Sequence, residues 1–391
     1  MKICAIVCEY TPFHNGHKYL LERARELSGC DALVCVMSAS LTQRGEICVL
    51  PKFLRAEHAV KGGADCVLQL PAAFSVAPAE IFAAGAVSII SKIPDVTHLA
   101  FGCENADGES IQKTAKILFD EDGTFKDALK RSLGGGESYK RAVARALEES
   151  GAQPGIASSP NNVLALEYAK ALLKAGSDIK IVPVERTGAG YAEKELKENF
   201  SSASGIRANL GNPKIAGNVP GYVFAALKGA DLKKAEEKLG AIERFAIDAR
   251  GTDGLKKVFG CTEGLENKIY SLRGENAEEI IKSSTGKRYS SSRIRRILAA
   301  NALSLYADDV KKYLAHGTYI KPLALNESMA DEIFAALAQS ELPVIVKQSD
   351  LNSLSPTARK CFLSDGRADF VRSLCFDESE YDYTVKFVKR Q

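Results

Sequence analysis

The fold of this chain is decided by its opening stretch, ICAIVCEYTPFHNGHKYLLERA, residues 3–24. Five apolar residues that favour a strand, 3–7, are followed by a polar turn and then by a helix-favouring run that starts at Lys18. This order predicts a buried strand, a tight turn, and a helix whose N-terminus opens beneath the turn. The first N–H groups of a helix are unpaired and lie at the positive end of its dipole, so the turn is suited to hold an anion.

Two histidines stand at this predicted helix start. His14 and His17 are three residues apart, so on one helical turn they point the same way, and Gly16 between them lets a phosphate approach the backbone. They could instead be zinc ligands, although no nearby Cys or His completes a set, or ordinary packed histidines. Their place directly after a strand and turn favours nucleotide handling, with the imidazoles stabilising charge on a transferring phosphate.

The first half of the chain alternates between strand and helix patterns. Short apolar strands separated by helices predict a parallel sheet with both faces covered, which binds ligands at the carboxyl ends of its strands. The predicted strands are residues 3–7, 32–37, 65–70, 97–101 and 178–184. The predicted helices are residues 18–28, 52–62, 78–91, 109–119, 137–149 and 161–175.

The residues that follow the other strands are candidates for the same site. The second strand leads to residues 43–46, a solvated loop or a substrate-binding lid. The fourth ends near Gly102, which forms a turn or allows close approach of a ribose or base. The fifth ends at Arg186, whose planar guanidinium suits phosphate oxygens.

Two serine-rich helix starts compete as a second phosphate site. Residues 200–207, FSSASGIR, offer N-capping serines that could instead hold the β- and γ-phosphates, with Arg207 one turn in. Residues 287–296, KRYSSSRIRR, resemble them but carry five cations in ten residues. We assign the first to ATP because it follows the fifth strand, and the second to RNA phosphates. The cations assigned to RNA are Lys287, Arg288, Arg293, Arg295 and Arg296.

The rest of the second half is mainly helical in pattern. Residues 208–231 are rich in Gly and Pro and predict a connector. Helical patterns follow at residues 232–250, 263–283, 292–314 and 327–340, and β-like runs at 343–347 and 383–388 have no assigned partner. We therefore predict a Rossmann-like α/β domain over residues 1–210 and a mainly helical domain over residues 211–391.

Composition narrows the class of protein. A chain of 391 residues with 46% hydrophobic and 26% charged residues describes a globular protein with an ample core, and a net charge of +3 does not by itself imply an anionic partner. Seven of the ten cysteines lie in the first 103 residues, mostly in apolar runs, so we expect reduced, buried thiols and a cytoplasmic location. The apolar run at the N-terminus is too short for a signal peptide, and no stretch approaches membrane length.

The motifs resemble those of a known family. HNGH, residues 14–17, resembles the His-x-Gly-His signature of the nucleotidyltransferase superfamily, and Ser204 and Arg207 match its second phosphate motif. The longer run EYTPFHNGH (9–17), with QRGE (43–46) and RTGAGY (186–191), is similar to the tRNA(Met) cytidine acetate ligases over most of the chain. Thr11 stands where that family's pattern has Asn, and residues 38–40, SAS, replace a turn rich in Ser and Gly.

What this resemblance implies is a nucleotidyltransferase domain followed by a tRNA-binding domain. Acetate and ATP would form acetyl-adenylate, and the acetyl group would pass to N4 of the wobble cytidine of elongator tRNA(Met). His14 and His17 would stabilise the transition state, and Arg186 and Arg207 would hold the leaving pyrophosphate. ATP would carry its own Mg²⁺, since no carboxylate cluster indicates a metal site in the protein. The remaining alternatives are a small-molecule adenylyltransferase and a non-catalytic RNA-binding protein.

The residues assigned to ATP by the motif and the resemblance together are Val7, Cys8, Glu9, Tyr10, Thr11, Pro12, Phe13, His14, Asn15, Gly16, His17, Lys18, Tyr19, Leu20, Gly102, Asn162, Arg186, Ser204 and Arg207.

Overall fold

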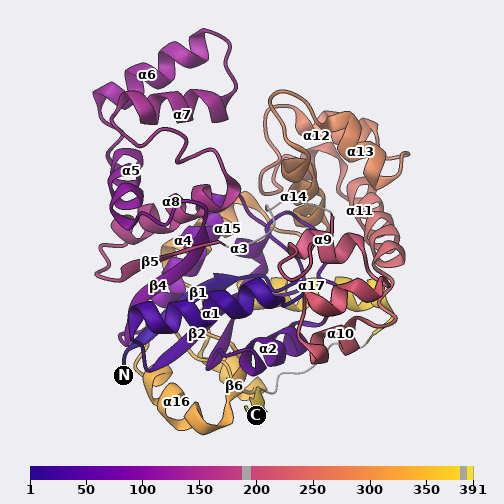
Figure 1. The fold of residues 1–391 in the computed structure, drawn as a ribbon. Helices are drawn as coiled ribbons and strands as arrows, with labels where there is room; N and C mark the ends of the chain where they lie inside the picture. The colour runs from indigo at the N-terminus through magenta and orange to yellow at the C-terminus, as the bar shows by residue number, and fades with distance from the viewer. Residues whose placement is uncertain (187–194, 379–384, 391) are drawn as a thin grey trace.

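The computed structural model describes residues 1–186, 195–378 and 385–390. A seven-stranded sheet with the order β5-β4-β1-β2-β3-β6-β7 runs through it (Figure 1). Its strands are β1 (Ile3–Cys8), β2 (Ala32–Ser38), β3 (Cys66–Leu70), β4 (Val96–Cys103), β5 (Lys180–Glu185), β6 (Pro322–Asn326) and β7 (Lys386–Val388). The predicted motif loop 187–191 lies outside the described residues.

The five predicted strands form the parallel part of this sheet. The strand β1 lies in the middle and pairs in parallel with β2 on one side and with β4 on the other. The chain continues from β2 to β3 on the first side and then crosses to β4 and β5 on the second. The strand order therefore reverses between β1 and β4, which is where open α/β sheets bind ligands.

The last two strands come from the second half of the chain. The strand β6 pairs antiparallel with β3, and β7 pairs in parallel with β6. The sheet is thus not confined to residues 1–210, as the predicted division of domains would have it. The β-like run at 343–347 is not a strand, since only an isolated bridge joins Val344 to Ile320.

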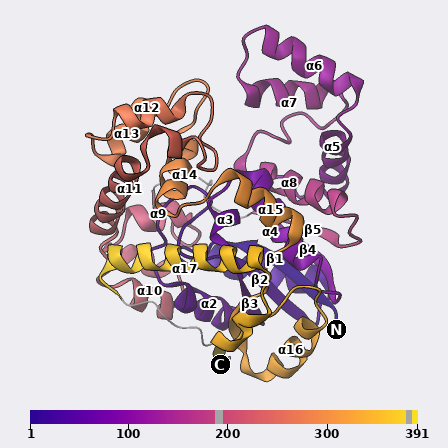
Figure 2. The same cartoon turned by 180° about the vertical axis from the view of Figure 1, so that it is seen from behind.

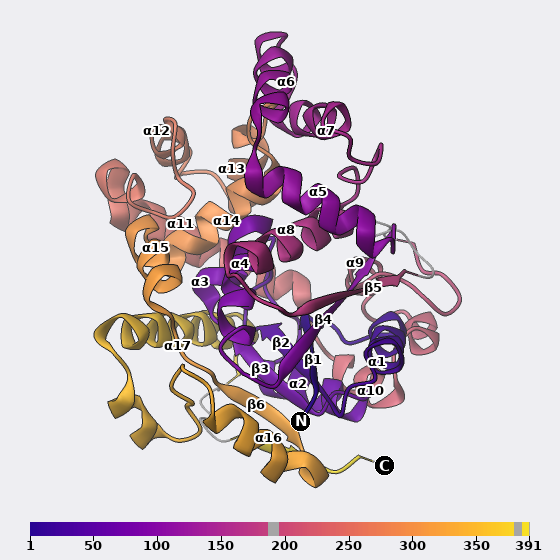
Figure 3. The same cartoon turned by 90° about the vertical axis from the view of Figure 1, so that its left-hand side faces the viewer.

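Helices cover both faces of the sheet (Figures 1 and 3). Those of the first half are α1 (Asn15–Ser28), α2 (Lys52–Lys61), α3 (Ala72–Ser75), α4 (Ala79–Ile90), α5 (Gly108–Asp120), α6 (Gly123–Gly134), α7 (Tyr139–Glu149), α8 (Pro160–Lys174) and α9 (Ala203–Ala208). Those of the second half are α10 (Gly221–Leu227), α11 (Leu232–Leu255), α12 (Leu265–Ser271), α13 (Ala277–Ser284), α14 (Ser291–Ala302), α15 (Ala307–His316), α16 (Ala330–Ala338) and α17 (Pro356–Phe376). Three 3₁₀ turns are η1 (Pro213–Gly217), η2 (Glu327–Met329) and η3 (Gln348–Ser353).

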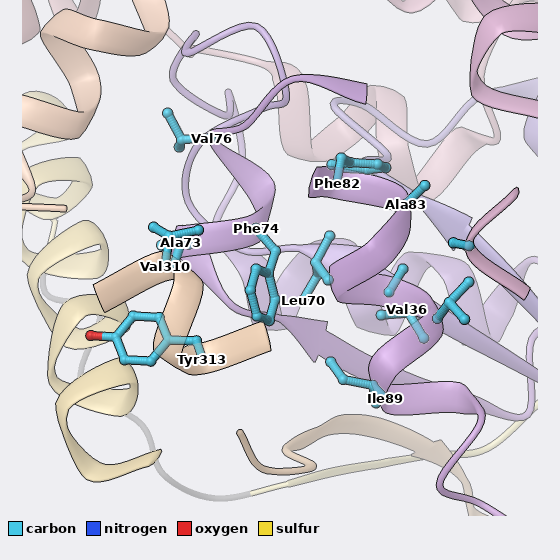
Figure 4. Packing of buried hydrophobic residues seen from close by; sticks show 14 of the residues in the cluster. Val36, Leu70, Ala73, Phe74, Val76, Phe82, Ala83, Ile89, Val310 and Tyr313 are labelled. Carbon is cyan, nitrogen blue, oxygen red and sulfur yellow. The ribbon is translucent and has the colours of Figure 1, made fainter. Parts of the chain in front are cut away.

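Alternate residues of β1 pack into two separate hydrophobic cores, one on each face of the sheet. Ile3 and Ala5 pack on the side that is covered by α3, α4, α8 and α15, whereas Cys4 and Ile6 pack on the side covered by α1, α2 and α10. Figure 4 shows the first core, with the Phe74 ring pointing from α3 toward α4. Nine of the ten cysteines are buried and Cys8 is half-buried, so the predicted burial of the thiols is confirmed.

The long helix α17 connects the second half to the sheet through buried polar contacts. Figure 2 shows it crossing the side of the molecule that faces away in Figure 1. Its Asp369 forms an ion pair with Lys52 and accepts a hydrogen bond from Ser40 Oγ at 2.6 Å. Its Asp365 accepts hydrogen bonds from the Ala72 backbone N–H and the Tyr319 hydroxyl. The periodicity of the sequence did not predict α17, because these acids lie on its buried face.

Candidate active site

A cleft of about 160 Å³ opens at the carboxyl ends of β1 and β4, where the strand order reverses. The N-termini of α1 and α9 point toward it, and the loop 43–46 closes one side. Its lining residues are Val7, Cys8, Glu9, Tyr10, Thr11, His14, His17, Leu20, Gln43, Arg44, Glu46, Phe82, Phe101, Gly102, Asn161, Leu164, Tyr168, Arg186, Ser202, Ala203, Ser204 and Arg207. Most residues that the sequence assigned to ATP therefore meet in one place.

The two histidines lie at the start of α1 with their rings stacked. The ring centroids are 3.6 Å apart at an interplanar angle of 20°. The backbone N–H of His14 donates to Nδ1 of His17 at 3.2 Å, which leaves the proton of a neutral His17 on Nε2. The side chain of His14 is 6% exposed, and its Nδ1 has no hydrogen-bond partner among the described residues. The pair thus presents imidazole nitrogens whose partners a phosphate oxygen could supply.

Both imidazoles are held in the neutral form. Burial, followed by the charges of Arg186 and Arg207, lowers the pKa of His14 to about 3. Burial, followed by His14 and Arg186, lowers the pKa of His17 well below its usual range. The same two arginines that disfavour an imidazolium favour a phosphate, so the field in this corner selects an anion over a further cation.

Arg186 follows β5 and lies across Gly102 at the end of β4. Its backbone N–H donates to the Cys103 carbonyl, which fixes the residue at the sheet edge. A Cβ on Gly102 would stand 3.3 Å from Arg186 Cγ, so the glycine makes room for the arginine side chain. The atoms nearest to Gly102 thus belong to a protein side chain, and close approach of a ribose or base there stays a prediction.

Arg207, in α9, closes the other end of the cleft. Its Nη1 donates to the Thr11 carbonyl at 2.9 Å, and its Nη2 forms an ion pair with Glu46 at 2.8 Å. Ser202 caps α9 by accepting from the Gly205 N–H, which leaves Ser204 to line the cleft. The loop 43–46, which the sequence left between solvated loop and lid, is thus tied to the cleft by an ion pair.

Asn162, which the resemblance assigns to the nucleotide, and its neighbour Asn161 make different contacts. Asn162 Oδ1 accepts from the backbone N–H groups of Glu104 and Asn105, at 2.9 and 3.2 Å, and so holds the turn after β4. Asn161, which was not singled out, lines the cleft and donates to Glu104 at 2.6 Å. A nucleotide contact by Asn162 stays a prediction.

The remaining residues of the 7–20 stretch lie around the cleft. Gly16 and Tyr19 line a smaller adjoining cavity of about 50 Å³. Pro12 and Phe13 are buried, and Pro12 follows a cis peptide bond. Asn15 donates to the backbone carbonyls of residues 199 and 217, and Lys18 is exposed beside Glu22.

Apolar side chains in the cleft wall were missed from the sequence. Phe82 comes from α4 and Tyr168 from α8, and the Tyr168 ring lies 5.7 Å from that of Phe101 in β4. Each sits in a run of helical or strand periodicity that reads as core. No sequence signal distinguishes such a residue from its packed neighbours, because its exposure to the cleft depends on where the strand order reverses.

The five cations assigned to RNA do not share one face. Lys287 and Arg288 are exposed before α14. Arg293 donates to Thr262 Oγ1 at 2.8 Å and stacks on the Tyr289 ring. Arg295 and Arg296 are half-buried and line two different cavities. RNA binding by all five stays a prediction.

Comparison with known proteins identifies the same family that the sequence motifs resemble. Residues 1–385 match the family model described as HIGH Nucleotidyl Transferase. A tRNA(Met) cytidine acetate ligase of Thermoanaerobacter sp. (strain X514) is 35% identical over 97% of this chain and 96% of its own length. The ligase of the same name from Acetivibrio thermocellus is 32% identical over 92% of each chain.

Solved structures agree with these relatives. TmcAL of Thermotoga maritima, apo form I, superposes with a TM-score of 0.89 at 28% identity, covering 96% of this chain and 95% of that one. The form of TmcAL bound with alpha-thio ATP gives 0.85 at 29% identity with the same coverage. The chain therefore belongs to the HIGH nucleotidyl transferase family and, within it, to the tRNA(Met) cytidine acetate ligases.

Proposed function

We propose that this protein activates acetate with ATP as acetyl-adenylate and transfers the acetyl group to N4 of the wobble cytidine of elongator tRNA(Met), giving N4-acetylcytidine. The observation that carries the ATP-dependent step is the stacked pair of neutral histidines in one cleft with Arg186 and Arg207. The acid and the RNA come from the names of the relatives.

The cleft supports adenylate formation by alignment and charge. An acetate oxygen attacks the α-phosphorus, and the bond from that phosphorus to the pyrophosphate oxygen breaks. The Nε2–H of His17 would donate to a non-bridging oxygen of the α-phosphate, where negative charge develops. Arg186 and Arg207 would hold the departing pyrophosphate through their planar guanidinium groups.

In the second step N4 of the cytidine attacks the acetyl carbon, AMP leaves as its phosphate anion, and N4 loses a proton. The same positive corner that binds the α-phosphate would then stabilise the AMP.

Mg²⁺ would enter with the nucleotide and neutralise charge on its polyphosphate. The residues that the structure describes include no group of three or more His, Cys, Asp or Glu side chains placed to hold a metal ion. The cleft also contains the carboxyls of Glu9 and Glu46, and Glu46 is paired with Arg207, so the arginines and the histidines are the groups offered to the phosphates. The part of the chain that the structure describes also contains no helix long and apolar enough to cross a membrane.

The test of the first step is His17→Ala, measured by acetate-dependent exchange of pyrophosphate into ATP. Losing one preorganised donor at the reacting phosphate should lower exchange about 10²- to 10³-fold. His316→Ala, at an exposed position on α15, is the control and should leave exchange unchanged. Exchange without acetate, or transfer of AMP to a phosphate acceptor, would instead identify a small-molecule adenylyltransferase.

The second step is tested by adding radiolabelled acetate, ATP and bulk tRNA and measuring label in the RNA. The paired change Lys287→Ala and Arg288→Ala should weaken tRNA binding and reduce its salt dependence by about one to two ion equivalents, because both side chains are exposed. Lys180→Ala, at an exposed position at the amino end of β5 and thus at the other end of the strands from the cleft, is the control. RNA binding without any acetylation would contradict the proposed transfer.

A further inference from the structure

A cavity of about 310 Å³ lies between α14 and the turn that joins α3 to α4, and residues 259–262 close a third side. Its volume falls in the range of small-ligand sites. Its apolar wall is formed by Val76, Pro78, Ile81, Phe259 and Ile297. Two arginines of α14, Arg293 and Arg296, complete the lining, and none of the described residues that line it is acidic. The cavity is therefore an apolar space with two positive charges on one wall.

Arg296 brings a charge without a partner to this wall. Its side chain is half-buried and makes no hydrogen bond or ion pair with the described residues. Burial, followed by the charge of Arg293, lowers the pKa of Arg296 to about 10, so the guanidinium is still protonated at neutral pH. A partly buried charge without a partner is unfavourable, and a second guanidinium beside it adds repulsion. An anion bound between the two arginines would offset both costs.

Arg293 is held in place by its neighbours. Its guanidinium stacks on the Tyr289 ring, and its Nη2 donates to Thr262 Oγ1 at 2.8 Å and to the Gly260 carbonyl at 3.4 Å. Among the described residues these hydrogen bonds occupy Nη2 alone, so the donors on Nε and Nη1 remain for a ligand. A fixed, planar guanidinium of this kind suits the oxygens of a phosphate.

The acids next to the cavity pair with other groups. Glu80, beside the lining residue Ile81, forms an ion pair with Lys170 of α8 at 3.6 Å. Glu263, beside Thr262, accepts a hydrogen bond from the Tyr289 hydroxyl at 2.9 Å. Neither forms an ion pair with the two arginines in the part of the chain that the structure describes, so the positive charge of the wall stays available to a ligand.

The cavity adjoins the proposed active site. Ile81 lines the cavity, whereas the next residue, Phe82, lines the cleft. The loop 43–46 closes one side of the cleft and also packs on α14, since a Cβ on Gly45 would stand 2.9 Å from the backbone nitrogen of Arg296. An anion at the two arginines would thus be separated by one loop from the place where the acetyl-adenylate forms.

The ligand must combine an anion with a larger apolar part. A lone inorganic phosphate would leave most of the apolar wall uncovered, whereas a nucleotide also has a ribose and a base that can pack on it. The proposed reaction brings an RNA chain to this position, because the nucleotides beside the acceptor cytidine must pass the rim of the cleft. The chemistry of the cavity therefore favours a nucleotide of the RNA.

We propose that this cavity binds the nucleotide next to the acceptor cytidine in the RNA chain, through a phosphate held between Arg293 and Arg296. This inference rests on the proposed function and adds to it an RNA subsite beside the cleft. Holding the neighbouring phosphate fixes the position of the acceptor nucleoside relative to the adenylate without reading its base.

The test combines arginine variants with RNAs that each lack one phosphate charge. The proteins are wild type, Arg293→Met, Arg296→Met and the control Arg273→Met, whose arginine also stacks on a tyrosine but lies outside the cavity. Methionine keeps an unbranched apolar stem in the cavity and removes the charge. The RNAs are a synthetic anticodon stem-loop, two versions with a methylphosphonate in place of the phosphate on the 5′ or the 3′ side of the wobble cytidine, and one with this replacement in the stem. Binding is measured by fluorescence anisotropy at one salt concentration, and acetate-dependent pyrophosphate exchange is measured without RNA.

We expect the wild-type protein to lose about 10- to 100-fold in affinity when one of the two flanking phosphates is neutralised, which is the size of one charge-assisted contact. The replacement in the stem should have little effect. Arg296→Met should lose a similar factor on the unmodified RNA and should no longer respond to neutralisation of that phosphate, and Arg293→Met should behave in the same way. Arg273→Met should match wild type, and exchange without RNA should stay at the wild-type level in all three variants.

The proposal is overturned if wild-type affinity is indifferent to both flanking phosphates, or if Arg296→Met stays as sensitive to them as wild type. Loss of exchange without RNA in Arg296→Met would also overturn it, because the arginines would then serve a free nucleotide rather than the RNA. Absence of acetate-dependent exchange in the wild-type protein would instead refute the proposed function.

Discussion

The ion pair between Arg207 and Glu46 makes it possible to measure separately what Arg207 contributes to stability and what it contributes to the reaction. Arg207 makes two hydrogen bonds, to Glu46 and to the Thr11 carbonyl, and the two charged side chains are only 15% and 25% exposed. Hydrogen bonds to charged groups contribute about 1.5–3 kcal/mol each, less where water still reaches them. We therefore expect Arg207→Met to lower the free energy of unfolding by about 2–3 kcal/mol.

Part of that loss comes from the carboxylates left behind. Without the guanidinium, Glu46 stays unpaired near Glu9, whose pKa burial already raises and Arg207 helps to lower. Replacing the carboxylate as well, in Arg207→Met with Glu46→Gln, should recover about 1 kcal/mol of stability, measured by urea denaturation. Acetate-dependent exchange should remain about 10²- to 10³-fold below wild type in both variants, because each lacks one of the two guanidinium groups proposed to hold the pyrophosphate.

Glu46→Gln alone should behave differently. It keeps the guanidinium and frees it from a competing anion, so exchange should persist and the KM for ATP should stay equal or fall. If the double variant regained exchange together with stability, the role of Arg207 would be structural, and its assignment to the pyrophosphate would be wrong.

Two further predictions concern the scaffold. Burial lowers the pKa of His58 to about 4, below its unfolded value of about 6.5, so the unfolded state binds a proton first and stability falls as the pH drops between these values. His58→Phe should make the unfolding temperature fall less between pH 7 and pH 5 than it does in the wild-type protein. His316→Phe, at an exposed position, should leave this pH dependence unchanged. If His58→Phe also left it unchanged, the assignment to His58 would be wrong. Gly85→Ala should destabilise by about 3 kcal/mol, because its Cβ would stand 2.2 Å from the Phe74 ring. Gly134→Ala, where nothing lies within 4 Å, should be neutral or slightly stabilising in the same urea titration, and equal effects at the two glycines would refute the packing argument.

The parallel strands could be predicted because their signals are local. Residues 3–7 and 32–37 are continuous apolar runs bounded by turns, and β1 and β2 extend each by one residue. The strand β6 gave no such signal: it is five residues long, starts with Pro322, and is defined by its partner β3. The helix α17 did carry a start signal, Ser355 as N-cap followed by Pro356, but its buried acids disrupt the apolar periodicity.

The same limit applies to the site. His14, His17 and Arg207 were found because short motifs carry them, and the structure brings all three to one cleft. The ion pair of Arg207 with Glu46 could not be predicted, since it joins residues 161 positions apart. The separation of Arg295 from the exposed cations also depends on which faces of α14 the neighbouring helices cover.

The participation of β6 and α17 in the sheet has a consequence for dissecting the molecule. A fragment that stops at residue 210 would keep the nucleotide motifs yet leave β3 as a bare edge, open to pairing with other chains. The fragment would also lack Asp369, the acid that neutralises the buried Lys52 ammonium. The half that contains the proposed site is thus completed by the half that follows it, and neither is expected to fold as a separate module.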